Sequence, residues 1–465
     1  MTFPGDQPNE LPPERGSMVP LGEATRTWFA ISLQTFGGPA GQIAVMQRAL
    51  VDEKRWIGQK RFLHALSFCT LLPGPEAQQL AIYVGWLLNG VPGVLIAGIL
   101  FVVPGVLALL GLSALYVGAG DTTVVTAVLA AVAPAVLVIV AQAVVRVGGR
   151  ALGHPALVAL AVAAFVALSV FKTPFPIVIA GAAVVGWALG RWAPATQRDP
   201  QRAADGSGGP PPVISDDALH TERPSRTHAA KVIAVGLVAW AVPVGAVVAF
   251  AGRDSIFADM ALFFTGAALV TFGGAYAVLA YVAQKAVQFY GWLTPTEMIT
   301  GLALAETTPG PLIMVVQFVA FVGAYHAPGA LNPWVAAVAA SLLTTWVTFV
   351  PCFVFVFVGA PYVERLRGNG ALSAALTGIM AAVVGVIANL AIYFAIHTLF
   401  RVVSTVSWGP IQLQVPELDT LKPLSLAVAA FAALLLFRAR WSVLRTLGAC
   451  ALVGLAAGLV EVVAG

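Results

Sequence analysis

The chain has 465 residues, of which 59% are hydrophobic and 10% charged, and its formal net charge is +4 at pH 7. Soluble domains average about 45–50% apolar and about 25% charged residues, so this composition excludes a soluble protein and predicts an all-α polytopic membrane protein. The small net charge is spread over loops and reports orientation in the membrane rather than affinity for nucleic acid. The three cysteines, Cys69, Cys352 and Cys450, lie in apolar runs without metal or disulfide spacing, so we expect packing roles, no metal site and no cofactor.

The N-terminal region contains the first interrupted apolar segment. Residues 1–23 are Pro-rich and lack the basic region and short apolar core of a cleaved signal, so we expect them to remain as a cytoplasmic tail. Residues 24–46 are apolar but contain FGGP at 36–39, which predicts a broken helix. A charged stretch at 48–61 follows, and its tryptophan predicts a short interfacial helix.

The next apolar segment, residues 62–88, contains the sequence PGP at 73–75. Two prolines that flank a glycine break a helix, and lipid tolerates such a break only where the freed backbone groups meet protein, water or a ligand. The break is therefore a candidate site. The rest of this half, which we place at 24–192, has apolar runs for about four spanning helices, with kinks expected at Pro104 and Pro134.

A polar segment divides the chain in two. Residues 193–230 are rich in Pro, Gly and charged residues and predict a disordered linker. Residues 231–256 predict a connecting transmembrane helix, and residues 257–465 form a second half. Further apolar runs in that half lie at about 257–283, 296–323, 332–359, 371–398, 421–437 and 441–463.

The second half repeats the first at an offset of 236 residues. TFGG at 35–38 returns at 271–274, and PGP at 73–75 returns at 309–311. At the same offset Trp56 corresponds to Trp292, and Pro92-Gly93 to Pro328-Gly329. Four landmarks in register without a gap indicate an internal duplication, which is a signature of transporter folds.

The segment order predicts that the two repeats are inverted in the membrane. The connecting helix is unpaired, so the second repeat enters from the opposite side, and the distribution of Lys and Arg favours a cytoplasmic N-terminus. The FGG and PGP segments are either broken spanning helices or paired re-entrant hairpins. We favour hairpins, because they move the basic stretch 48–61 to the cytoplasmic side and because the arms beside PGP are too short to span alone.

The helix breaks have the chemistry of an anion site. Helix starts near Pro39, Pro75, Ala275 and Pro311 each offer unpaired N–H groups and roughly half a positive charge, so together they suit a dianion. The alternative is that the breaks are kinks and close-packing glycines, which are common in membrane bundles. The candidate substrate-binding residues are Gly37, Gly38, Pro39, Gln42, Pro73, Gly74, Pro75, Gly273, Gly274, Pro309, Gly310 and Pro311.

Two carboxylates lie beside the PGP breaks and are candidates for proton coupling. Glu76 follows the first break directly, and Glu306 precedes the second by three residues. An intramembrane carboxylate is costly, and it suits an anion site if a proton neutralises it when the anion binds. The alternative for Glu76 is that it caps its own helix start. Gln34 and Gln79 are further donors, whereas packing is expected for His64 and His397 and membrane anchoring for Arg48.

The two motifs resemble those of the chromate ion transporter family in its long, two-domain form. The resemblance rests on FGGPAGQIAVMQRALVDEKRWI with LLPGPEAQQLAIYVGWLLNG, and on the degenerate repeat TFGGAYAVLAYVAQKAV with TTPGPLIMVVQFVAF. It implies a bacterial inner-membrane carrier that expels chromate, an isostere of sulfate, by proton motive force or exchange, and so confers chromate resistance. The second repeat departs from the first at Ala275 in place of Pro39 and at Leu312 in place of Glu76, so two equivalent sites are not expected.

The residues predict a multi-pass transporter for a small, doubly charged anion bound at half-helix N-termini, and the resemblance implies that this anion is chromate, exported in exchange or competition with sulfate. The alternatives are a carrier for another oxyanion such as sulfate or molybdate, and a channel. An enzyme is disfavoured because the chain has no HExxH, GxSxG, Cys/His pairing or clustered acid pair. The expected partners are a small oxyanion, protons and the lipid bilayer, but no nucleic acid, and a homodimer is left open.

Overall fold

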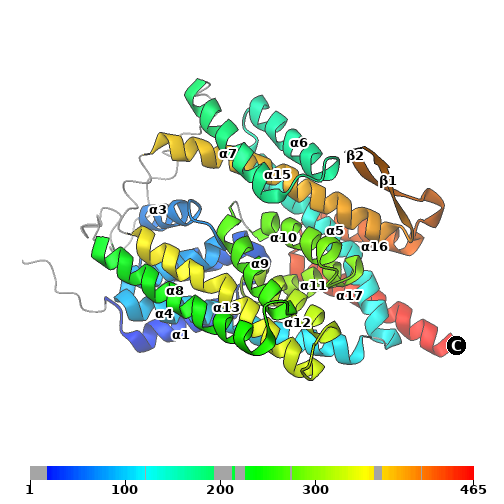
Figure 1. Ribbon diagram of the computed structural model, residues 1–465, viewed down its shortest axis with the longest axis horizontal. Coiled ribbons are helices and arrows are strands. Elements are labelled where there is room, and N and C mark those ends of the chain that lie inside the picture. The colour runs from blue at the N-terminus through cyan, green and yellow to red at the C-terminus, as the bar shows by residue number, and fades with distance from the viewer. Residues whose placement is uncertain are drawn as a thin grey trace, which may run out of the picture.

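The computed structural model describes residues 18–120, 122–192, 212–214, 226–272, 275–360, 369–409 and 411–464. Residues 1–17 of the expected tail, most of the expected linker, and Gly273 and Gly274 lie outside these ranges. Figure 1 shows long helices that run along the long axis of the molecule, with shorter helices between them.

The described part of the first half consists of helices joined by turns. Its helices are α1 (Leu21–Ser32), α2 (Gly38–Gln47) continued by the π-helix η1 (Arg48–Glu53), α3 (Gln59–Cys69), α4 (Glu76–Ala119), α5 (Thr123–Ala151), α6 (Pro155–Ser169) and α7 (Phe175–Trp192). The prediction of a separate interfacial helix at 48–61 is wrong, because η1 extends α2 and a turn then leads into α3. Trp56 lies in that turn and is only 4% exposed, so it packs inside the protein.

The second half repeats this order and adds a small sheet. Its helices are α8 (Arg226–Ala251), α9 (Ile256–Val270), α10 (Ala275–Ala283) continued by η3 (Gln284–Phe289), α11 (Pro295–Thr307), η4 (Leu312–Met314), α12 (Val315–His326), α13 (Pro333–Gly359), α15 (Gly370–Leu399), η6 (Leu418–Thr420), α16 (Pro423–Ala433) continued by η7 (Leu434–Arg438), and α17 (Val443–Ala464). Between α15 and η6, strand β1 (Val403–Trp408) pairs antiparallel with β2 (Ile411–Pro416), so that Trp408 lies opposite Ile411. The sequence analysis did not predict this β-hairpin.

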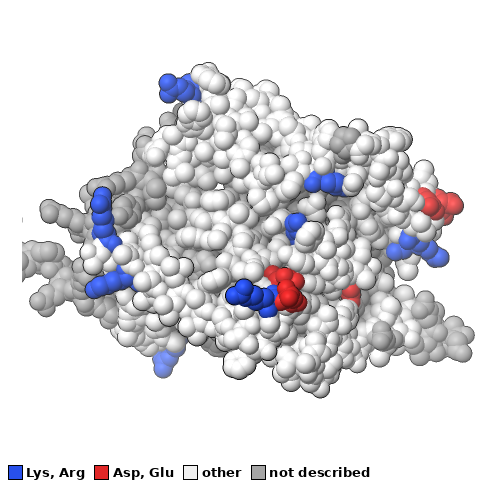
Figure 2. Space-filling model, in the orientation of Figure 1, with Lys and Arg blue, Asp and Glu red and all other residues white. Residues whose placement is uncertain are grey.

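Six helices in the described residues are long and apolar enough to cross a membrane: α4, α5, α7, α8, α13 and α15. Their outer faces carry large apolar side chains, and on α8 Phe250 is 92% and Val235 69% exposed. Figure 2 shows a face of the molecule on which charged residues are few and lie in small, separate groups. A belt of this kind is buried in lipid rather than in water.

The interrupted segments fold back on themselves as helical hairpins. Lys54, just after η1, forms an ion pair with Glu23 at the start of α1, at 2.9 Å. His326, at the end of α12, lies 3.7 Å from Glu297 at the start of α11. Along an unbent helix these pairs would be roughly 40 Å or more apart at 1.5 Å per residue. The first FGG segment and the second PGP segment are therefore hairpins and not straight broken helices.

Helix α4 contains a second reversal of direction. Asn89 and Gly90 have non-helical backbone angles, so α4 is two helices joined at this point. A Cβ atom on Gly85 would meet the carbonyl of Gly93, which means that the two parts pack closely after the reversal. Residues 76–88 therefore form the second arm of the first PGP hairpin, and residues 91–119 form the first long helix that can span.

The last three helices of each half pack against those of the other half. α15 of the second half packs against α6 and α7 of the first, whereas α5 of the first half packs against α16 and α17 of the second. Glycines allow this contact, since a Cβ on Gly186 of α7 would lie 2.6 Å from Gly378 Cα of α15. A Cβ on Gly454 of α17 would lie 2.5 Å from the Ala127 carbonyl of α5. Each half is therefore completed by helices of the other.

Part of the expected disordered linker is ordered. Ile214 forms a parallel bridge with Ile57, and Gly58 N–H donates a hydrogen bond to the Ile214 carbonyl at 3.0 Å. The Ile214 side chain is only 5% exposed. The prediction of disorder is therefore wrong for residues 212–214, which pair with the turn after η1.

Candidate functional site

The tips of the hairpins from the two halves meet in a reciprocal pair of hydrogen bonds. Gly310 N–H of the second PGP donates to the Thr35 carbonyl of the first TFGG at 3.1 Å. Gly74 N–H of the first PGP donates to the Thr271 carbonyl of the second TFGG at 2.8 Å. Thr35 and Thr271 correspond in the repeat, as do Gly74 and Gly310, so the contact has approximate two-fold symmetry. We call these four residues the tip junction.

Only glycine fits the two PGP positions of the tip junction. Gly74 has φ +121° and Gly310 has φ +105°, values that side chains rarely allow. A Cβ on Gly74 would lie 3.0 Å from Cys352 Sγ of α13, and a Cβ on Gly310 would lie 3.4 Å from Gly105 Cα of α4. Each PGP tip therefore packs against a spanning helix of the other half, and the positive φ makes a side chain at either position strained.

Several hydrogen-bond donors that were expected to bind an anion instead form hydrogen bonds at the tip junction. The N–H groups of Gly74 and Gly310 donate to threonine carbonyls. Gln42 Nε2 donates to the Gly310 carbonyl at 2.6 Å, and Gln79 Nε2 donates to the Pro73 carbonyl at 2.6 Å. In this conformation these donors hold the hairpins together. The PGP glycine amides therefore bind threonine carbonyls in this conformation, and their role as anion ligands stays a prediction.

The start of α2 keeps the character of an anion site. Gly37 and Gly38 have φ of +78° and +75°, Pro39 lies in the first turn, and no side chain caps the helix. An uncapped helix start carries unpaired N–H groups and a partial positive charge. A Cβ on Gly38 would lie 3.6 Å from Tyr276 Oη, so a side chain of the second half reaches this helix start.

Tyr276 links that helix start to a buried carboxylate. Its hydroxyl donates to Glu306 Oε1 at 2.6 Å, which joins the first turn of α10 to the end of α11. Glu306 is 1% exposed, and its Oε2 atom has no hydrogen-bond partner in the described part of the chain. A buried carboxylate oxygen without a partner is costly, so it marks a place for a proton or a ligand.

Two arginines of α5 interact electrostatically with the two candidate carboxylates. The charge of Arg146 acts on Glu306, and the charge of Arg150, one turn further along the helix, acts on Glu76. Glu76 lies in the first turn of α4 and is partly exposed. Positive charge therefore lies within reach of both carboxylates, and it would also attract an anion that enters beside α5.

Other predicted residues take structural positions. Pro75 and Pro311 each precede their helix by one residue. Arg48 donates to Gln34 Oε1 at 3.1 Å, and His397 Nδ1 lies 2.8 Å from the Tyr393 carbonyl. All three cysteines are buried and free. Gly273 and Gly274 lie outside the described residues.

The sequence analysis missed four residues of this region. Thr35 and Thr271 belong to the repeated TFGG, and their repetition was a signal that could have found them. Gln78 is fully buried, and neither amide atom has a hydrogen-bond partner among the described residues. Tyr276 gave no local signal, because its partner Glu306 is 30 residues away in the sequence.

Spanning helices, duplicated halves and interrupted hairpins that meet between the halves define a membrane transport protein. The family model described as chromate transporter matches residues 22–187 and again 258–455, and the chain belongs to this family. The protein is therefore a multi-pass membrane protein of a transporter family and not an enzyme. The resemblance inferred from the FGG and PGP motifs is confirmed.

Curated relatives agree with this assignment over most of the chain. A chromate transport protein of Pseudomonas aeruginosa is 30% identical over 81% of this chain and 82% of its own length. A probable chromate transport protein of Synechococcus elongatus is 26% identical over 89% of this chain and 94% of its own. A chromate transport protein of Cupriavidus metallidurans is 26% identical over 77% and 79%. No solved structure matches the chain.

Proposed function

We propose that the protein exports chromate across the bacterial inner membrane together with a proton, driven by the membrane-potential component of the proton motive force. The relatives named chromate transport proteins support the choice of anion. The proton is supported by one observation above all. Glu306 is a buried carboxylate with an unpaired oxygen, and Tyr276 joins it to the uncapped start of α2.

The coupling follows from charge. A helix start attracts a dianion, whereas an ionised Glu306 close by repels it. When Glu306 takes up a proton, the repulsion ends and the protonated carboxyl can donate a hydrogen bond to an oxyanion. Anion and proton therefore bind together. A dianion with one proton carries one net negative charge outward, and an interior-negative potential favours this by about 2.3 kcal/mol per 100 mV.

The proposal includes inverted repeats and re-entrant hairpins. The approximate two-fold symmetry of the tip junction supports it, as does the loop of basic residues after α2, which suits the cytoplasmic side. With this orientation the hairpins of the first half enter from the cytoplasm and those of the second half from outside. Their tips then meet near the middle of the bilayer, where carriers of this kind bind their substrates.

Flux measurements on purified protein in liposomes test the substrate. We expect saturable chromate efflux that accelerates under an interior-negative potassium diffusion potential and that sulfate inhibits. Sulfate flux without chromate flux would make the protein a carrier of another oxyanion. Flux that does not saturate would make it a channel.

Glu306→Gln tests the proton. We expect the ratio of protons to chromate to fall from one to zero, because the amide cannot take up a proton, while exchange of chromate for chromate continues. Glu53→Gln is the matched control, since Glu53 is exposed and paired with Arg48 at the far end of η1. Loss of coupling in Glu76→Gln but not in Glu306→Gln would move the proton site to Glu76.

A further inference from the structure

A cavity of about 230 Å³, lined by both apolar and polar side chains, lies between the two halves, away from the tip junction. The end of α6 and the loop after it form one wall, and α10, η3, α15 and β2 form the others. Figure 1 places this region toward the end of the molecule where β1 and β2 lie. The polar side chains of its lining are Ser169, Lys172, Gln284, Gln288, Asn389, Tyr393 and Gln414.

The chemistry of this lining favours an anion. Lys172 supplies an ammonium group, and the lining contains neither Asp nor Glu. Burial lowers the pKa of Lys172, because the charged form loses hydration, and a bound anion would compensate that loss. The carboxamides supply further N–H donors. The volume is below the 300–1,000 Å³ or so of pockets for drug-sized ligands, so a small anion fits best.

Hydrogen bonds fix the walls of the cavity. Gln412 N–H of β2 donates to the Val170 carbonyl at 2.9 Å, which ties the β-hairpin of one half to the loop of the other. In the same loop Thr173 N–H donates to the Ala167 carbonyl at 2.9 Å, and Lys172 has φ +49°. The lysine is therefore held at the cavity by its backbone.

One wall of the cavity is formed by the same helix face on which Tyr276, the partner of Glu306, lies. Ala280, Gln284 and Gln288 of the lining recur every four residues along α10 and η3, so they lie on one face. Tyr276 precedes Ala280 by four residues on the same face, about 6 Å deeper along the helix axis. Tyr276, the partner of Glu306, therefore lies one helical turn beyond the cavity lining on the same face.

We propose that this cavity is a second anion site, which holds a small oxyanion between the Tyr276–Glu306 pair and the membrane face on the side of β1 and β2. The inference rests on the proposed function only for the identity of the anion and its direction of travel. Under the proposed orientation the site lies on the outer side and receives the anion before release.

Equilibrium binding of chromate to the purified full-length protein tests this site directly. We expect two anions per chain in the wild type and one in Lys172→Gln, with two retained in Lys172→Arg. Lys285→Gln is the matched control, because Lys285 lies on η3 beside Gln284 but its ammonium lies over the Phe289 ring, 4.0 Å from the centroid, and is not part of the lining. Wild-type stoichiometry in Lys172→Gln would overturn the second site.

A second measurement does not depend on the folding of the lysine variant. In Gln414→Cys we expect a negatively charged thiol reagent to react faster than a positively charged one of the same size, and chromate to slow both. Equal rates without protection would overturn the site. Wild-type protein that transports chromate but binds one anion overturns the cavity and leaves the proposed function intact. Protein that binds two anions but transports no chromate overturns the proposed function and leaves the second site intact.

Discussion

The hairpins of the two halves share one backbone arrangement. A π-helix ends the second arm of each FGG hairpin, at 48–53 and at 284–289. Trp56 N–H donates to the Leu50 carbonyl at 2.8 Å, and the corresponding Trp292 N–H donates to the Ala286 carbonyl at 2.8 Å. The backbone is thus repeated in detail, including the turn that follows each π-helix.

The side chains that line this backbone differ sharply between the halves. The first half has Gln42, Glu76, Gln78 and Gln79, where the second has Val278, Leu312, Met314 and Val315. The second half has Tyr276 and Glu306, where the first has Ala40 and Thr70. The two halves therefore have the same backbone arrangement at the tip junction, but different polar and ionisable side chains around it. A symmetric backbone can therefore carry different functional side chains in its two halves. Some variants test the shared backbone, and others test the side chains that differ.

The largest expected effect comes from breaking the shared backbone. Gly74→Val and Gly310→Val should each abolish transport. The positive φ alone costs about 1–3 kcal/mol for a β-branched residue, and the displaced tip loses its hydrogen bond to threonine at a cost of about 1–3 kcal/mol. Chromate flux in liposomes and thermal unfolding in detergent measure the two effects.

Gly329→Val is the control for these variants. Gly329 also has a positive φ, of +64°, but a Cβ there meets nothing within 4 Å. It should cost stability without abolishing transport. Near-normal flux in Gly74→Val or Gly310→Val would show that the tip junction is dispensable.

Tyr276→Phe tests the asymmetric chemistry and should have an intermediate effect. It removes the 2.6 Å hydrogen bond to Glu306 without changing the shape of the ring. A hydrogen bond to a charged group contributes about 1.5–3 kcal/mol, so the carboxylate becomes less stable relative to the protonated form. The pH of half-maximal proton-coupled transport should rise by about one unit or more, since 1.36 kcal/mol corresponds to one unit.

Tyr281→Phe is the control, because Tyr281 lies on the same helix but its ring packs against Phe175, with the centroids 5.1 Å apart. Its pH profile should match the wild type. An unchanged profile in Tyr276→Phe would mean that the Tyr276 hydrogen bond does not act on the coupled proton.

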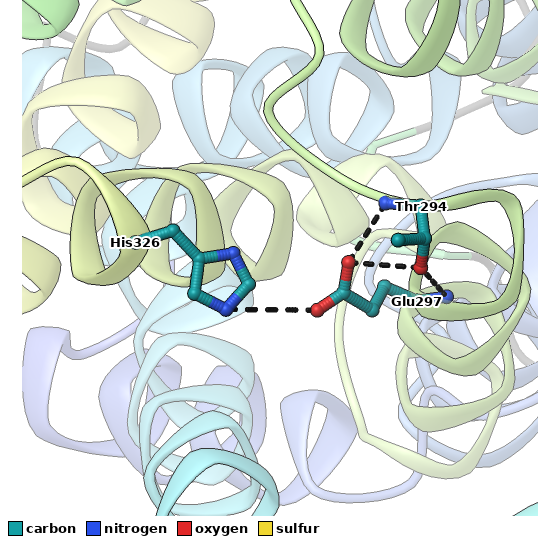
Figure 3. A network of polar contacts seen from close by, with 3 residues as sticks. All are labelled: Thr294, Glu297 and His326. Atoms are coloured by element: carbon teal, nitrogen blue, oxygen red, sulfur yellow. Dashed lines mark hydrogen bonds and ion pairs between the residues drawn. The ribbon is translucent and has the colours of Figure 1, made fainter.

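The smallest effects are expected at the outer ends of the hairpins. Figure 3 shows Glu297, which accepts from Thr294 N–H at 2.7 Å and pairs with His326. Thr294 Oγ1 caps the helix by accepting from Glu297 N–H at 3.2 Å, and Thr294→Ala removes this cap and should cost about 1 kcal/mol. Lys54→Ala breaks the pair with Glu23 and should cost less than about 1 kcal/mol, because both side chains are more than 40% exposed.

Thermal unfolding of the two variants compares these ends. Transport should stay close to wild type in both. A loss of several kcal/mol in Lys54→Ala would mean that the ends of the first hairpin hold it closed more strongly than an exposed ion pair can.

Much of the fold could be predicted from the sequence because its signals are local. Apolar runs gave the long helices within a few residues, as at 333–359 for the expected 332–359, and the spacing of Gly and Pro gave the breaks. The β-hairpin at 403–416 was missed because its strands, VSTVSW and IQLQVP, are too short and too polar to form an apolar run. IQLQVP alternates apolar and polar residues, and this period-two signal could have revealed the second strand.

The site was harder to predict because its contacts are not local. The repeat identified Gly74 and Gly310 as equivalent residues, but equivalence does not reveal that each binds the other half's threonine. The N–H groups expected to meet an anion therefore meet protein carbonyls instead. Glu306 could be singled out as a carboxylate in an apolar run, whereas its partner Tyr276 looks like any aromatic residue of a membrane helix until the fold brings them together.

The reciprocal tip junction also has a consequence for synthesis. Thr35 is synthesised well before its partner Gly310, which lies 275 residues later in the chain. At about 5–20 residues per second, translation takes on the order of 15–55 s to cover that distance. During this interval the Thr35 carbonyl and the Gly74 N–H of the first half lack their partners from the second half. Nascent chains should therefore depend on insertion factors or on water at the translocation site until the second PGP emerges.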